Sequence, residues 1–176
     1  MVRIFTRRPV FLPAAAVAVL ATLAGCSGGS GAVGVAAPTT SGAASAQCAA
    51  LQARLPQTLL GHKRRSTTPA SPDTAAWGDP AIVLRCGVAE PGAMNPASPQ
   101  YDPKQTNSVA VVSDGVCWLS QQTSGGGFRF TTVKQNTYVE VDVPGAYQGQ
   151  SWPMPALAGP VQKADPVDPD TVFDCL

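Results

Sequence analysis

The sequence predicts an α+β domain, with a small antiparallel sheet, one or two short helices and disulfide cross-links. The sheet is indicated by residues 138–143, where Val139, Val141 and Val143 alternate with polar side chains. A half-buried antiparallel strand requires that alternation. A helix is indicated by Leu51 and Leu55, whose spacing of four residues places them on one helical face. Four cysteines beyond residue 47 indicate the cross-links.

Five runs rich in β-branched and aromatic residues are expected to form strands. Asp114-Gly115 and the segment 134–137 each separate two of these runs by the length of a hairpin turn. Pairing within each hairpin should therefore be antiparallel. The expected strands are 81–88, 109–112, 116–119, 128–133 and 138–143.

The rest of the domain is expected to consist of short helices and long loops. Pro56 should end the first helix near Leu55, because the residue before a proline disfavours the helical conformation. A second short helix is expected around residues 156–164. Residues 62–80 and 89–108 contain several prolines and are expected to be loops.

The N-terminus has the order of charged and apolar residues found in an export signal. Three arginines lie within residues 1–8, and an apolar run follows over residues 10–24. This run is short for a spanning helix, which needs about twenty residues. Residues 23–26, Leu-Ala-Gly-Cys, resemble a bacterial lipobox. The resemblance implies cleavage before Cys26 and a diacylglyceryl group on its thiol; the alternatives are an ordinary secretory peptide cut nearby or a weak membrane anchor.

These features divide the chain into a signal peptide (1–25), lipidated Cys26 with a flexible tether (26–47), and a single α+β envelope domain (48–176). The 21 residues of 27–47 are small or polar apart from valine, and they bury too little apolar surface to offset chain entropy. A flexible linker of this length spans about 25 Å. We therefore expect the protein on the extracytoplasmic face of a cell membrane, anchored by lipid.

The cysteines that remain after lipidation of Cys26 are even in number, and four cysteines allow three pairings. We favour Cys48–Cys86, which would join the first helix to the first strand, and Cys117–Cys175, which would join the tail to the sheet. Structural disulfides suit an exported domain. A metal or redox site is not indicated, because there is no C-x-x-C motif and His62 is the single histidine. We expect no metal and no cofactor.

The charge of the chain argues against a nucleic-acid partner. The whole sequence has a net charge of +1, but three of its twelve basic residues lie in the export signal. Without them, nine basic and eleven acidic residues leave the mature chain at −2. A protein that binds nucleic acid needs a basic surface to neutralise phosphates.

Six residues are candidates for binding. The basic cluster of His62, Lys63, Arg64 and Arg65 would suit a lipid phosphate, a cell-wall carboxylate or an acidic partner. The simpler interpretation is a solvated loop, as for most short charge runs. Trp77 would suit a groove for glycan, although core packing is the stronger default for a tryptophan.

Arg85 interrupts an apolar strand beside a cysteine. It is interpreted either as part of a binding cleft, or as a side chain at the sheet edge or paired with Glu140 or another acid.

Several sequence blocks of the domain resemble an actinobacterial lipoprotein family described as domain of unknown function 3515. The resemblance implies a shared fold and location, and it implies no reaction. The blocks are Cys48 with Leu51, Leu55 and Pro56; residues 77–88; residues 115–119; residues 130–132; and residues 139–144.

The anchor, the tether and the lack of a recognisable catalytic constellation favour a non-enzymatic binding or accessory module of the cell envelope. Its expected partners are the membrane, through Cys26, and an envelope protein or cell-wall component. The alternative is a hydrolytic or cell-wall-modifying enzyme, which would need a pocket that gathers His62, an acid and a hydroxyl group. No catalytic residue is assigned.

Overall fold

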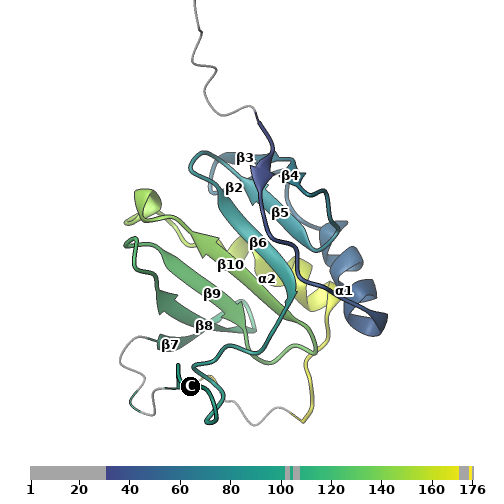
Figure 1. Cartoon of the computed structure of the whole chain (residues 1–176), viewed down its shortest axis with the longest axis vertical. Helices are drawn as coiled ribbons and strands as arrows, with labels where there is room; N and C mark the ends of the chain where they lie inside the picture. Colours follow the sequence, from purple (N-terminus) through teal and green to yellow (C-terminus); the bar gives the residue numbers. More distant parts are fainter. Residues whose placement is uncertain (1–30, 102–103, 105–107, 171–174, 176) are drawn as a thin grey trace, which may run out of the picture.

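The computed structural model describes residues 31–101, 104, 108–170 and 175. Their main feature is an eight-stranded antiparallel sheet with two helices on one face (Figure 1). The strand order is β2-β3-β5-β6-β10-β9-β8-β7. The expected α+β class is confirmed. The export signal and Cys26 lie outside the described residues.

Ten strands, two α-helices and one short 3₁₀ helix make up the described elements. The N-terminal half contains β1 (Val33–Gly34), α1 (Gly42–Gln52), β2 (Thr58–Leu59), β3 (His62–Arg65), β4 (Thr67–Thr68), β5 (Thr74–Trp77) and β6 (Ile82–Val88). The C-terminal half contains β7 (Ser108–Ser113), β8 (Val116–Gln122), β9 (Phe128–Thr132), β10 (Tyr138–Val143), η1 (Gly145–Tyr147) and α2 (Met154–Ala164).

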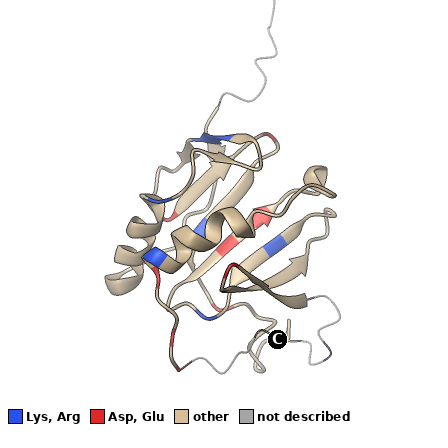
Figure 2. Cartoon of the chain, turned by 180° about the vertical axis from the view of Figure 1, so that it is seen from behind, with Lys and Arg blue, Asp and Glu red and all other residues tan. Residues whose placement is uncertain are grey.

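The hydrophobic core lies between the sheet and the two helices. Val139, Val141 and Val143 of β10 all point into it, as their alternation predicted. Figure 2 shows α2 crossing this face of the sheet. The helix buries a stripe of residues at spacings of three and four, which is how an amphipathic helix covers a sheet. The stripe consists of Met154, Leu157, Ala158 and Val161.

Two disulfides join distant parts of the chain. Cys48 of α1 bonds to Cys86 of β6, with their Cα atoms 5.6 Å apart. Cys117 of β8 bonds to Cys175, with their Cα atoms 5.8 Å apart. These are the two pairs favoured from the sequence. The first disulfide holds α1 against the sheet, and the second holds the C-terminal tail at the far end of the sheet.

The tether expected over residues 26–47 is too long, because much of it belongs to the fold. Val33 donates from its amide to Ser66 O at 2.8 Å and Val35 to Thr68 O at 3.0 Å, so β1 pairs in parallel with β4. Helix α1 begins at Gly42, six residues before the expected domain boundary. Small residues such as alanine form good helices as well as linkers, so composition did not separate the two.

The expected loop over residues 62–80 is also wrong, since it contains β3, β4 and β5. Strand β3 is hidden in the sequence by its four basic residues, which are typical of solvent-exposed segments. Strand β5 has mostly short side chains and is buried along its whole length, so its sequence shows no alternation of polar and apolar residues. The two hairpins, β7–β8 and β9–β10, pair as expected.

Candidate functional site

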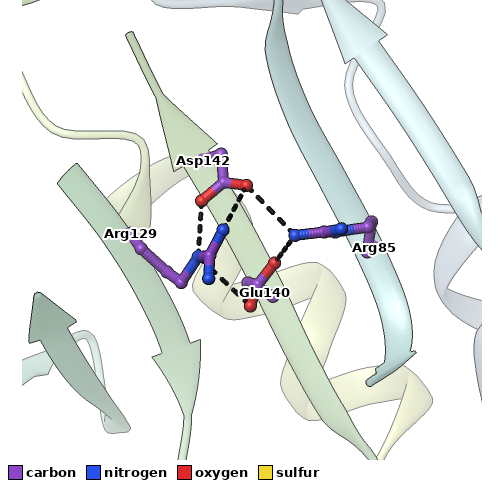
Figure 3. Close-up of polar contacts among 4 residues, drawn as sticks. All are labelled: Arg85, Arg129, Glu140 and Asp142. Carbon is purple, nitrogen blue, oxygen red and sulfur yellow. Dashed lines mark hydrogen bonds and ion pairs between the residues drawn. The ribbon is translucent and has the colours of Figure 1, made fainter. Parts of the chain in front are cut away.

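A cluster of four charged residues lies on the face of the sheet that the helices leave uncovered. Arg85 projects from β6, Arg129 from β9, and Glu140 and Asp142 from β10 between them (Figure 3). The sheet register brings them together, because Glu140 is paired with Arg85 and Asp142 with Arg129. We call these four residues the charge cluster. Period-two alternation sends them away from the core valines of β10.

Each arginine of the charge cluster contacts both acids. Arg129 holds Asp142 in a two-pronged contact, from Nε to Oδ1 at 2.7 Å and from Nη2 to Oδ2 at 3.0 Å. Its Nε also lies 3.2 Å from Oε2 of Glu140. Arg85 donates from Nη2 to Glu140 Oε1 and, at 3.2 Å, to Asp142 Oδ2. The two acids therefore neutralise the two arginines. The paired Arg–carboxylate contacts also hold the side chains in defined orientations.

The charge cluster is partly withdrawn from water. The Glu140 side chain is 11% exposed, whereas that of Arg129 is 39% exposed. A carboxylate so far buried needs cationic partners, because an unpaired buried charge is costly. The hydrogen bond to Asp142 raises the pKa of Arg129 above its ordinary value, and the attraction of both acids adds to it although burial opposes the shift. Arg129 thus remains a fixed cation.

A cavity of about 370 Å³ opens above the charge cluster. Arg85, Arg129 and Glu140 line it from the sheet, and residues 88–93 line it from the loop that follows β6. The loop is held in place by a small second core, in which Ala93 and Met94 pack against Leu119 and its neighbours. The size falls within the range of small-molecule sites, about 300–1,000 Å³.

Thr131 gives the cavity a buried hydroxyl group. It sits on β9 opposite Glu140, lines the cavity, and is 1% exposed. Among the described residues its Oγ1 has no hydrogen-bond partner. Buried hydroxyls are normally satisfied, and one that is not calls for an explanation such as a ligand or water. Because Oγ1 has almost no surface open to solvent, a group bound in the cavity could reach it only if neighbouring side chains moved aside.

The sequence-predicted binding residues are divided by the fold. Arg85 lies at the cavity and pairs with Glu140, the partner named for it above. His62, Lys63, Arg64 and Arg65 form β3, two strands away from β6 in the sheet.

Within β3, the His62 ring lies 4.6 Å from that of Tyr147, and the Arg64 guanidinium sits 5.3 Å over the Trp77 ring. Burial lowers the pKa of Arg64. This basic cluster is therefore a paired strand and not the solvated loop expected.

Trp77 does not line a ligand groove. Its side chain is 0% exposed, and its indole Nε1 donates to Pro56 O at 2.9 Å. Trp77 therefore packs in the hydrophobic core, as expected by default for a tryptophan. Arg129 and Thr131 were missed from the sequence. Their one signal is the alternation of Phe128-Arg129-Phe130-Thr131, which places them together on one face of a strand.

A family model described as a protein of unknown function (DUF3515) matches residues 10–169. The chain belongs to this family. No curated protein and no solved structure matches the chain. Membership of DUF3515 carries no reaction or ligand with it.

The cavity of this DUF3515 chain is lined by side chains of both charges. Of the two acids in its lining, Glu140 is held by both arginines and Glu90 comes from the loop after β6; the lining within the described residues includes no histidine, serine or cysteine. In the part of the chain that the structure describes, no cluster of three potential metal-ligating side chains occurs. None of the helices that the structure describes is long and apolar enough to span a membrane.

Proposed function

We propose that this DUF3515 chain is a lipid-anchored binding module on the extracytoplasmic face of a cell membrane, and that its ligand enters the cavity above the charge cluster. The cavity of about 370 Å³, lined by both arginines of the charge cluster, is the observation that carries the binding role. The order of arginines, apolar run and Cys26 in the sequence supports the anchor.

The charges of the cavity indicate the chemistry of the ligand. Arg85 and Arg129 line the cavity together with Glu90 and Glu140, so the lining has no net charge but carries both signs. Such a surface favours a ligand that carries both an amino and a carboxylate group, because each then meets its opposite. Free peptide ends of a cell-wall component have this combination. Thr131 would then bond to one polar atom of the ligand.

The geometry supports binding over hydrolysis. A hydrolase of the type considered from the sequence needs His62 beside an acid and a hydroxyl. His62 lies on β3 against Tyr147 and does not line the cavity. Glu140 and Asp142 share one strand and are both engaged by arginines, which leaves neither poised as a general acid or base.

The binding role is tested with a muropeptide that has free amino and carboxylate groups, and with the same peptide acetylated and amidated. We expect the free peptide to shift the amide NMR signals of residues 85, 129 and 131, and the blocked peptide to do so much less. Thr131→Val should weaken binding about tenfold, which corresponds to one lost hydrogen bond of about 1–1.5 kcal/mol. Thr58→Val is the matched control, because Thr58 is an exposed threonine on β2.

Equal effects of Thr131→Val and Thr58→Val, or equal binding of free and blocked peptide, would count against the cavity. The anchor is tested separately. We expect mass spectrometry of the membrane-purified protein to find diacylglyceryl on Cys26, and Cys26→Ala to move the protein out of the membrane fraction. A Cys26→Ala protein that stays in that fraction with its lipid would refute the anchor.

A further inference from the structure

The described chain begins beside the basic strand β3, and this position limits how far the domain can stand from an anchor at Cys26. The guanidinium Nη2 of Arg65 donates to the carbonyl of Gly31 at 2.8 Å. Strand β1 then pairs with β4, and Val35 is buried. Residues 31–35 are therefore fastened to the domain, and they are not part of a tether.

Few residues remain between the anchor and this fixed point. Gly31 is five residues after Cys26. Fully extended chain covers at most about 3.6 Å per residue, so the two residues are separated by about 18 Å or less, whatever the conformation between them. The end of the domain that carries β1, β3 and β4 must therefore stay close to the lipid head groups, whereas β7 and β8 lie toward the opposite end of the sheet (Figure 1).

This end of the domain is basic. Strand β3 contributes three successive cations, Lys63, Arg64 and Arg65. The exposed acid beside them is Asp79, 3.8 Å from Arg65, and Asp73 is buried and accepts a hydrogen bond from Thr40. Figure 2 shows basic residues, with an acidic loop beside them, at the end of the molecule where the described chain begins.

Lys63 is the cation best placed to reach a membrane. Its side chain is exposed, and it alternates with Arg64 so that it shares a face of β3 with Arg65. Arg65 in turn contacts Gly31, so this is the face on which the anchored segment joins the domain.

We propose that strand β3 docks on anionic phospholipid head groups of the membrane that carries the anchor, with Lys63 in contact and the charge-cluster cavity turned outward along the sheet. The proposal rests on the lipid anchor proposed above. A basic side chain near an anionic surface contributes enough to change occupancy about fivefold. The short connection keeps β3 within reach of that surface.

The test uses the mature protein purified with its lipid and inserted into nanodiscs that contain a gadolinium-bearing lipid. Paramagnetic broadening of backbone amides then reports which residues approach the head groups. We expect the strongest broadening in β1, β3 and β4 and the weakest in β7. Replacing phosphatidylglycerol by phosphatidylcholine should reduce the contrast, and Lys63→Gln should reduce the docked population about fivefold. Lys163→Gln, an exposed lysine on α2, is the matched control and should change nothing.

The outcomes separate this proposal from the one it rests on. A mature protein whose Cys26 carries no lipid overturns both. A lipid-bearing protein with uniform broadening, or with its maximum in β7, overturns the docking and leaves the anchor standing. Equal effects of Lys63→Gln and Lys163→Gln also overturn the docking.

Discussion

The charge cluster should be energetically coupled, and the strength of that coupling is predictable from its burial. Arg85 and Glu140 face each other across β6 and β10, with side chains 27% and 11% exposed. Exposed ion pairs contribute about 0–1 kcal/mol, whereas breaking a buried pair costs about 3–5 kcal/mol. For a pair between these limits we expect Glu140→Gln to lower the free energy of unfolding by about 1–3 kcal/mol.

A double-mutant cycle isolates the interaction. Arg85→Gln, Glu140→Gln and the double variant are compared by urea denaturation, and the coupling free energy should be about 1–2 kcal/mol. The Arg65–Asp79 pair is the matched control, because its 3.8 Å contact involves an acid that is 65% exposed. Its cycle with Arg65→Gln and Asp79→Asn should give less than about 0.5 kcal/mol. Equal couplings in the two cycles would refute the argument that the Arg85–Glu140 pair is partly desolvated and fixed.

Three further predictions concern stability. Burial raises the pKa of Asp165 to about 6 from an ordinary value of 3.8, so its ionisation opposes folding and stability is lost as pH rises through that window. Asp165→Asn should therefore raise the free energy of unfolding in urea by about 1–3 kcal/mol at pH 7 and by little at pH 4. An equal gain at both pH values would contradict the assignment of the effect to the ionisation of Asp165. Gly127→Ala should lower stability by about 1–3 kcal/mol, because its Cβ would meet the Val143 carbonyl. Gly125→Ala, with open space around it, should be nearly neutral in the same assay. Replacing Cys48 and Cys86 by serine removes a cross-link between residues 38 apart and should lower the free energy of unfolding by about 4 kcal/mol. Equal unfolding of the oxidised and reduced wild-type proteins would contradict this stabilising role.

The parts of the fold that sequence predicted are those where side-chain pattern and burial coincide. Strand β10 has one buried and one polar face, so its alternation could be seen directly. Strand β6 and the two hairpins also carried their own local signals of apolar runs and turns. A helix was expected around residues 156–164, and α2 occupies Met154–Ala164 with a buried stripe that repeats every three or four residues.

The missed elements depend on contacts that no local pattern records. The basic residues of β3 are accommodated because Arg64 covers the Trp77 ring and Arg65 binds backbone carbonyls. β1 is a strand only because β4 lies beside it. The segment expected to be a tether therefore could not be separated from the domain by composition alone.

The candidate site was partly within reach of the sequence. Arg85 stood out as a cation within an apolar strand, and Glu140 was named as one possible partner. Arg129 and Thr131 join them through the β9–β10 register, which brings Arg129 opposite Asp142 and Thr131 opposite Glu140. The cavity also needs the loop after β6, whose path over the sheet depends on Met94 packing beside Leu119. Neither the register nor the loop path is encoded in a short motif.

We propose that the ligand of this DUF3515 chain binds at the cavity above the charge cluster. A photo-crosslinking amino acid placed at Gln100, an exposed residue of the cavity lining, tests it in cells, and Lys163 on the helix-covered face supplies the control position. We predict a discrete adduct from position 100 that is reduced by Thr131→Val and absent from position 163. Identical adducts from both positions, or an adduct from position 163 alone, would contradict the account.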